Sequence, residues 1–151
     1  MTIEKNIDYP FLNKDLLNRA LTRRAYALEQ KQQKKECEDQ EIYRVLGDAV
    51  LRLVLVDLLI TLGCASREEI TTKKQRLERE EMLAKIARKL SIGKFIKLGI
   101  GEQKQQANDE PKVLAETLEA IIGAIYFDGG YDKTKEVISQ WFKSYLTKIK
   151  W

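Results

Sequence analysis

The sequence contains no histidine and only two cysteines, Cys37 and Cys64, among its 151 residues. Without histidine, a Ser-His-Asp hydrolase, a nuclease with a histidine base and a zinc site with histidine ligands are all excluded. Two cysteines are also too few for a disulfide framework or a structural zinc site. The composition therefore predicts a protein without zinc in a reducing, cytoplasmic setting.

Proline is equally scarce, with Pro10 and Pro111 as its only occurrences. Apolar residues recur at helical spacing through almost the whole chain. A composition of 44% hydrophobic and 33% charged residues is sufficient for one core in a chain of this length. No internal repeat or linker interrupts the pattern, so the sequence predicts a single all-α domain over residues 1–151.

Long uncharged apolar runs are absent as well. The most apolar stretch, residues 45–62, contains Asp48, Arg52 and Asp57, and charges in such a window favour a buried core helix over a membrane span. The first residues lack an apolar stretch behind a basic start, which argues against a secretory signal. We therefore expect no membrane partner.

Helical periodicity divides the chain into segments. We expect helices at residues 11–21, 39–62, 66–90 with a break near residue 80, 111–126, and from residue 132 onward. Leu12 is expected on the apolar stripe of the first helix, and Asp132 can cap the last. The second is apolar on nearly all sides, which predicts neighbours in several directions. Ser66 and Glu69 form a capping-box pattern at the start of the third. The polar stretch 23–40 is expected as a loop or an exposed helical extension, and residues 102–110 as a polar loop.

Positive charge is concentrated in one part of the chain. Residues 67–97 carry ten basic and five acidic side chains, whereas the whole chain has a net charge of only +4. Such an excess can neutralise phosphates and release counterions on nucleic-acid binding. A solvated helix face rich in lysine and glutamate explains the same composition, so charge alone leaves both interpretations open.

Two of the expected helices carry acids that need partners. Glu41, Arg44 and Asp48 share one face of the second helix, and Glu116 and Glu119 are one turn apart on a later helix. If the two helices pack together, Asp48, Glu116 and Glu119 would form an oxygen-rich cage of the kind that Mg²⁺ prefers. A bound metal can activate water for phosphodiester hydrolysis without a histidine.

The same spacing also fits an arrangement without metal. Arg44 lies three residues from Glu41 and four from Asp48, so it could pair with both. Glu116 and Glu119 would then be partly exposed helix acids. Spacing alone does not distinguish this arrangement from the cage.

Two segments resemble the ribonuclease III family. The segment VLGDAVL at residues 45–51 is similar to the signature helix of that family, and ETLEAIIGAIY at residues 116–126 is similar to its second acidic helix. Their acids Asp48 and Glu119 are 71 residues apart, a separation similar to that in the family. Weaker matches lie before and between them, and the likeness covers residues 9–142.

This resemblance implies an all-helical domain that forms a homodimer through the signature helix, binds double-stranded RNA and cuts both strands with Mg²⁺, or with Mn²⁺ in its place. Asp48 and Glu119 match the two acids most central to catalysis, and both are expected metal ligands together with Glu116. Glu41 matches the first acid of the signature helix and is expected to support the site.

Some positions depart from the family pattern. Arg44 stands where the signature helix has a second glutamate, and Glu116 stands where the family has an aspartate. A guanidinium cannot ligate Mg²⁺ and competes with the cation for the neighbouring aspartate, although short relatives of the Mini-III type also lack an acid at this position and are nucleases. Val45 replaces the usual phenylalanine of the dimer interface. A further family acid aligns with Arg67, or with Glu68 after a one-residue shift.

The chain ends at Trp151, which leaves no room for the double-stranded-RNA-binding domain of most bacterial family members. We expect the catalytic dimer to hold RNA itself, or a separate RNA-binding partner protein to do so. The basic residues expected to contact RNA are Lys73, Lys74, Arg76 and Arg79. The predicted function is a Mg²⁺-dependent endoribonuclease. The alternatives are a catalytically impaired relative that binds structured RNA or a ribonucleoprotein, and a helical dimer with no role in RNA metabolism.

Overall fold

The computed structural model describes residues 2–148, so residues 1 and 149–151 of the expected domain lie outside the described part. Within that part, every regular element is a helix, apart from one isolated bridge between Thr22 and Lys97. The elements in chain order are α1 (Ile3–Ile7), α2 (Lys14–Ala20), α3 (Arg24–Gln32), α4 (Glu41–Thr61), α5 (Arg67–Glu78), α6 (Glu80–Lys89), the 3₁₀ turn η1 (Gly93–Phe95), α7 (Ile100–Lys104), the 3₁₀ turn η2 (Ala107–Asp109) and α8 (Pro111–Lys148). The all-α prediction is confirmed.

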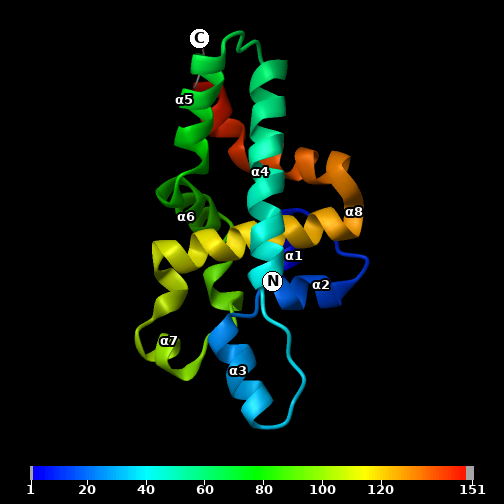
Figure 1. Cartoon of the computed structure of the whole chain (residues 1–151), viewed down its shortest axis with the longest axis vertical. Helices are drawn as coiled ribbons and strands as arrows, with labels where there is room; N and C mark the ends of the chain where they lie inside the picture. The colour runs from blue at the N-terminus through cyan, green and yellow to red at the C-terminus, as the bar shows by residue number, and fades with distance from the viewer. Residues whose placement is uncertain (1, 149–151) are drawn as a thin grey trace.

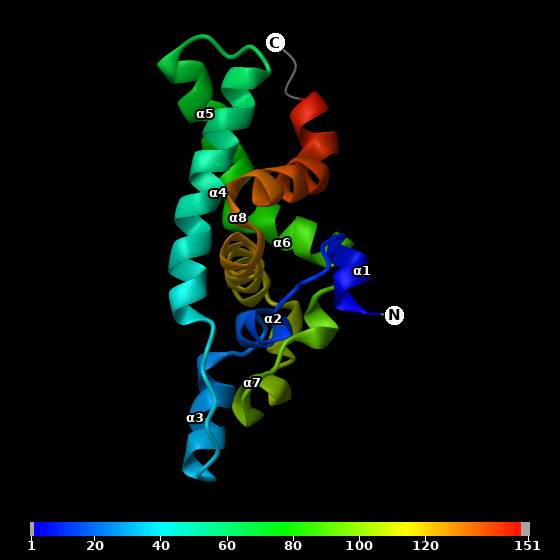
Figure 2. The ribbon, with the colours of Figure 1, turned by 90° about the vertical axis from the view of Figure 1, so that its right-hand side faces the viewer.

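The first half of α8 forms the centre of the molecule. Figure 1 shows α4 crossing it, and Figure 2 shows it nearly end-on, with α4 on one side and α2 and α6 on the others. The side chains of Leu118, Ile121, Ile122 and Ile125 are fully buried. A helix that is apolar on nearly all faces has to be enclosed by its neighbours, which explains this central position.

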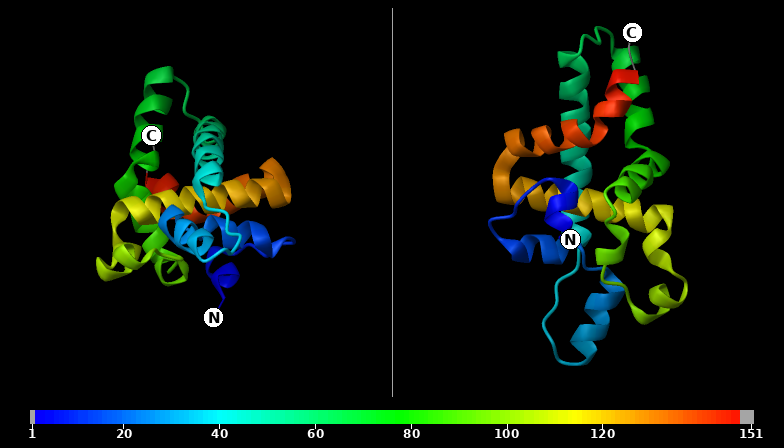
Figure 3. Two further views of the ribbon diagram at one scale, coloured as in Figure 1. Left: turned by 60° about the horizontal axis from the view of Figure 1, so that its bottom comes forward. Right: turned by 180° about the vertical axis from the view of Figure 1, so that it is seen from behind.

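The helix expected to end near residue 126 bends instead. α8 runs to Gly130, where φ is 84°, a left-handed value that glycine adopts without strain. The helix then resumes, and Thr134 Oγ1 donates a hydrogen bond of 2.7 Å to the Gly130 carbonyl. Asp132 therefore lies within the resumed helix rather than capping it. Figure 3 shows the second half of α8 folding back over the first.

Helix α4 matches the expected span within two residues at its start and one at its end. α4 has neighbours on several sides as expected, but one face is left uncovered, because Ile42, Val45, Leu53 and Ile60 are each more than half exposed. We call these four residues the apolar stripe of α4. None of the described helices is long and apolar enough to cross a membrane.

The helix start predicted at Ser66 is confirmed. Ser66 Oγ accepts a hydrogen bond of 3.1 Å from the backbone N–H of Glu69. The expected break falls at Arg79, whose ψ of 149° is extended and separates α5 from α6. α5 packs against α4 and α6 packs against α8, so the basic segment of the sequence covers one side of the molecule (Figure 1).

The N-terminal third departs most from expectation. The helix expected at residues 11–21 spans only residues 14–20, because Asn13 caps it, and Leu12, expected on its apolar stripe, is 89% exposed. Helix α1 was not expected, and residues 23–40 contain the helical extension α3 followed by a loop. The expected loop at residues 102–110 holds the end of α7 and η2.

Candidate functional site

Two glycines bring α4 and α8 into backbone contact. A Cβ atom at Gly47 would overlap the carbonyl of Glu119, and one at Gly123 would overlap the carbonyl of Tyr43. The helices can therefore approach this closely only where both lack a side chain. Asp48 follows one of these glycines directly, and Glu119 lies one turn before the other, so the crossing brings the two acids together.

Asp48 and Glu119 form a pair of facing carboxyl groups. The pKa of Glu119 is raised to about 8, first by burial and then by its hydrogen bond and charge repulsion with Asp48, while Arg44 partly opposes this shift. The Asp48 side chain is 40% exposed and lies 3.5 Å from Arg52 Nη2, one turn further along α4. The close crossing of α4 and α8 at Gly47 and Gly123 keeps these two acids together.

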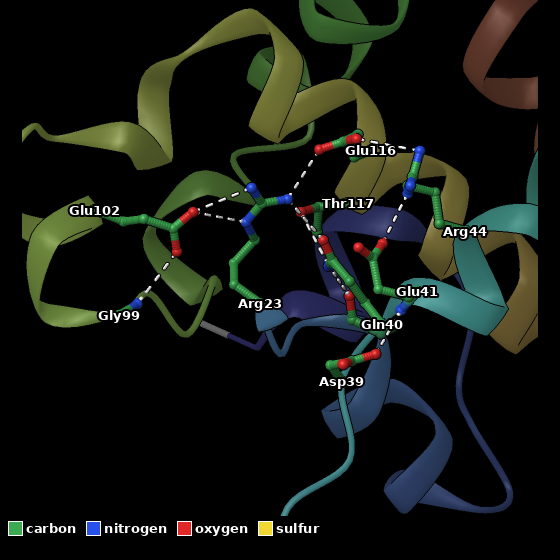
Figure 4. A network of polar contacts seen from close by, with 10 residues as sticks. Arg23, Asp39, Gln40, Glu41, Arg44, Gly99, Glu102, Glu116 and Thr117 are labelled. Atoms are coloured by element: carbon green, nitrogen blue, oxygen red, sulfur yellow. Dashed lines mark hydrogen bonds and ion pairs between the residues drawn. The ribbon is translucent and has the colours of Figure 1, made fainter. Parts of the chain in front are cut away.

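Glu116 has different neighbours although it lies one turn before Glu119. Its Oε1 lies 3.0 Å from Arg23 Nη1, and its Oε2 lies 3.1 Å from Arg44 Nη1. Figure 4 shows the carboxylate between the two guanidinium groups. Glu116 is near enough to Glu119 to raise the pKa of that residue further, but both of its oxygens already have positively charged partners.

The expected three-acid cage is therefore only partly assembled. Asp48 and Glu119 meet as expected, whereas Glu116 is turned towards the arginines. No group of three or more histidine, cysteine, aspartate or glutamate side chains among residues 2–148 is arranged to hold a metal ion. The role of each acid as a metal ligand stays a prediction.

Glu41 and Arg44 form the pair that their spacing suggested. Arg44 Nε donates a hydrogen bond of 3.0 Å to Glu41 Oε2. The other pairing that the spacing allowed, between Arg44 and Asp48, does not form, because Arg44 reaches across to Glu116 and Asp48 pairs with Arg52. The supporting acid is thus positioned to hold Arg44.

Sequence reasoning missed Arg23. It lies in a polar stretch without a recognisable pattern, yet its side chain donates to Gln40 Oε1 at 3.0 Å as well as to Glu116, and reaches Glu102 at 3.1 Å. Gln40 is itself buried and donates to the carbonyl of Ala20. A single arginine in a loop carries no periodic signal, so only the fold reveals this contact.

The residues expected to contact RNA lie on α5 and at the turn that follows it. Lys73 pairs with Glu69 at 2.9 Å and Lys74 pairs with Glu78 at 3.3 Å, which leaves less of their charge available to an external phosphate. Arg76 and Arg79 are exposed and form no ion pair within the described residues. Which of these four binds RNA stays a prediction.

The two positions that align with a further family acid lie apart from the pair. Arg67 and Glu68 begin α5 and are 3.6 Å from each other, with side chains 89% and 75% exposed. Figure 1 places the start of α5 at the end of α4 opposite to Glu41. Within one chain, neither residue joins Asp48 and Glu119.

Comparisons with known proteins agree with this geometry. The family model described as Ribonuclease-III-like matches residues 13–146. Ribonuclease 3 of Pseudothermotoga lettingae is 36% identical over 147 residues, which cover 96% of this chain and 62% of that protein. Ribonuclease 3 of Clostridium kluyveri is 37% identical over 97% of this chain and 59% of its own length. The chain thus spans about 60% of the length of these curated relatives.

Solved structures give a match along the whole domain. A crystal structure of the nuclease domain of ribonuclease III from Campylobacter jejuni is 30% identical, with a TM-score of 0.82 over 94% of this chain and 92% of that one. A second structure of that domain gives a TM-score of 0.84 over 94% of both chains. The chain belongs to the ribonuclease III family.

Proposed function

We propose that this protein is a divalent-metal-dependent endoribonuclease that cleaves double-stranded RNA. The observation that carries the proposal is the Asp48–Glu119 pair, in which two helices deliver facing, partly buried carboxyl groups in a domain of this family. Two carboxyl groups do not stabilise a fold as opposite charges would, because repulsion between them opposes folding when both are ionised. A bound cation would turn this repulsion into attraction.

The donor set fits a hard divalent ion such as Mg²⁺ or Mn²⁺. Asp48 and Glu119 supply carboxylate oxygens, and Mg²⁺ is commonly held by one or two carboxylates together with waters and phosphate oxygens. When bound, the ion would supply Lewis acidity towards the scissile phosphate and lower the pKa of a coordinated water. Asp48 and Glu119 would hold it, and Glu116 could join them only after losing its arginine partners.

The apolar stripe of α4 supports a homodimer. Val45 is 68% exposed and Ile42 63% exposed, and large apolar side chains in one row mark an interaction surface. A structure of the Campylobacter jejuni nuclease domain describes a region involved in dimer formation. We expect two copies of this chain to bury the stripe against each other.

The dimer is tested by sedimentation of Leu53→Asp. Leu53 is 57% exposed in the middle of the stripe, and a charge there would have to be buried without a partner, so we expect a monomer. The matched control is Leu12→Asp, because Leu12 is 89% exposed and lies outside α4. If Leu53→Asp sediments like the native dimer, the apolar stripe is not part of the dimer interface.

We expect RNA to be recognised through its phosphates and its duplex shape. Arg76, on α5, and Arg79, at the turn that follows it, are exposed basic residues, and A-form RNA is bound mainly through backbone contacts and shape. A separate RNA-binding partner and a cytoplasmic setting also remain part of this proposal, the latter supported by the two free thiols Cys37 and Cys64.

Cleavage of a blunt RNA duplex tests the proposed activity. The native protein should cut it in Mg²⁺ or Mn²⁺, and Glu119→Gln should abolish cutting, since a neutral amide binds a divalent ion much more weakly than a carboxylate does. Glu136→Gln, an exposed acid on the same helix, is the matched control and should cut normally. If the native protein binds RNA in a salt-sensitive way but never cuts it, the proposal is wrong and the protein is a catalytically impaired relative that binds RNA.

A further inference from the structure

Arg44 is held at two of its three guanidinium nitrogens. Nε donates to Glu41 Oε2 at 3.0 Å, and Nη1 lies 3.1 Å from Glu116 Oε2. Figure 4 shows Arg44 between these acids, which come from two different helices. Attachment at two points fixes the plane of the guanidinium, so Arg44 occupies its position before any substrate arrives.

Glu116 is held just as firmly from its other side. Arg23 contacts Glu116 Oε1 through Nη1, while its Nε and Nη2 both donate to Glu102 Oε2 at 3.1 Å. The side chains of Arg23 and Glu116 are only 17% and 16% exposed. Recruitment of Glu116 to a metal would therefore break two partly buried ion pairs and leave both arginines without that partner.

The third nitrogen of Arg44 is available to a ligand. Nη2 has no hydrogen-bond or ion-pair partner among residues 2–148, and 35% of the side chain is exposed. Arg44 also lies close enough to Glu119 to interact with its charge. A fixed guanidinium at the edge of an acidic pair suits a phosphate oxygen, which accepts hydrogen bonds from planar N–H groups.

We propose that the site holds one divalent cation, between Asp48 and Glu119, and that Arg44 binds the RNA phosphate in place of a second cation. This inference rests on the proposed function, because it assumes that the pair holds a cation. With Glu116 committed to Arg23 and Arg44, two carboxylates remain for metal, those of Glu119 and of Asp48, whose only ion pair is with the exposed Arg52. Two carboxylates suffice for one ion that keeps water and phosphate ligands, and a second ion would have to share them with the first.

Counting bound Mn²⁺ by electron paramagnetic resonance tests the metal part of this proposal. The native chain should bind one Mn²⁺. Arg44→Glu should bind two, because the substitution adds a carboxylate and releases one oxygen of Glu116. The matched control is Arg52→Glu, which makes the same charge change on the same helix within 3.5 Å of Asp48 but leaves the contacts of Arg44 intact; it should bind one.

Each count has a distinct meaning. Two Mn²⁺ in the native chain would overturn the single-cation site while leaving the proposed nuclease function in place. No bound Mn²⁺ in the native chain would overturn both the single-cation site and the proposed nuclease function. One Mn²⁺ in Arg44→Glu, or two in Arg52→Glu, would show that Arg44 does not determine the number of ions.

Affinity for an RNA duplex, measured without divalent metal, tests the phosphate contact separately. Arg44→Gln should weaken binding roughly tenfold, because it removes a charge-assisted hydrogen bond. Lys14→Gln removes one positive charge from an exposed position on α2 and should weaken binding by no more than about twofold. Equal affinities of the native protein and Arg44→Gln would overturn the assignment of Arg44 to the phosphate.

Discussion

Glu116 and Glu119 lie one turn apart on α8, yet their nearest partners differ in charge. Glu116 is enclosed by two arginines at 3.0 and 3.1 Å. Glu119 faces another acid, and its pKa is raised to about 8 by burial and by Asp48. The comparison shows that the neighbouring elements determine whether an acid on a helix stabilises the fold or binds a ligand. The position of the acid along the helix does not determine this.

This difference separates stability from function. The arginine partners of Glu116 neutralise its charge, so a metal gains little by approaching it and the fold gains from its presence. The Asp48–Glu119 pair is compensated less, because Asp48 has only the exposed Arg52 at 3.5 Å and Glu119 forms no ion pair within the described residues. Repulsion between the two acids therefore lowers the stability of the metal-free protein whenever both are ionised. Binding sites often carry such unfavourable arrangements, which the rest of the fold tolerates.

The largest expected effect is on cleavage. Asp48→Asn should lower the rate of RNA cleavage by about a thousandfold or more, because it removes one of the two carboxylates expected to hold the ion. Glu116→Gln should keep measurable cleavage under the same conditions, since Glu116 is engaged by arginines. The rates are measured in single-turnover assays on one duplex. Equal losses of cleavage rate in the two variants would show that Asp48 and Glu116 do not differ in their contribution to cleavage.

The second effect is a pH-dependent gain of stability in Glu119→Gln. The folded-state pKa of Glu119 lies above its ordinary value of 4.5, so the native metal-free protein loses stability as the pH rises from about 4.5 to about 8. At pH 9 the variant should be more stable by about 2–4 kcal/mol, and at pH 4 the difference should be close to zero. Urea denaturation at the two pH values measures it.

Addition of Mg²⁺ provides the control for that experiment. The ion should stabilise the native protein at pH 9 and leave Glu119→Gln unchanged, because binding to the folded state alone raises its stability. A variant that is less stable than the native metal-free protein at pH 9 would contradict the proposed repulsion between Asp48 and Glu119.

A loss of stability is expected for Glu116→Gln. The substitution leaves the side chains of Arg23 and Arg44 without a carboxylate between them, which should cost about 2–3 kcal/mol. Thermal unfolding at neutral pH measures the loss, with Glu136→Gln as the matched exposed control. Unchanged stability would mean that the arginine cluster contributes nothing to the fold.

The smallest effect concerns an acid satisfied by neutral donors. Asp128 accepts hydrogen bonds from Tyr9 Oη at 2.7 Å and from the backbone N–H groups of Leu12 and Asn13 at 3.0 and 2.9 Å. Burial acts to raise the pKa of Asp128, but these donors outweigh it and the pKa is lowered. Asp128→Asn should therefore lower stability at pH 7 by about 1–2 kcal/mol.

This stability difference should shrink in acid. A lowered folded-state pKa gives stability that is present above the ordinary aspartate value of 3.8 and is lost as the pH falls below it. Urea denaturation of Asp128→Asn and the native protein between pH 7 and pH 3 measures the trend. A difference that stays constant over this range would show that the charge of Asp128 has no part in it.

The helices that carry the site were predictable from the sequence, and the contacts between them were only partly so. The apolar runs of α4 and the first half of α8 are long and strongly periodic, and the motifs around Asp48 and Glu119 implied their meeting. The bend at Gly130 was missed because a glycine pair usually ends a helix. Short helices such as α1 depend on packing against the core, which local sequence does not record.

The partners of individual side chains were the least predictable part. Helical spacing offered Arg44 both Glu41 and Asp48, but the fold presents Glu116 from α8 at 3.1 Å instead of Asp48. Arg23 reaches the same acid from a loop 93 residues away in sequence. Ion pairs across elements are set by tertiary geometry, so sequence patterns on one helix cannot specify them.

Titration of the Glu119 side-chain carboxyl by ¹³C nuclear magnetic resonance tests the central claim most directly. Without metal, the carboxyl should titrate with a pKa of about 8, and saturating Mg²⁺ should lower the pKa by several units because the bound cation favours the ionised form. Titration near the ordinary glutamate value without metal, or a pKa near 8 that Mg²⁺ leaves unchanged, would contradict a metal site built on Asp48 and Glu119.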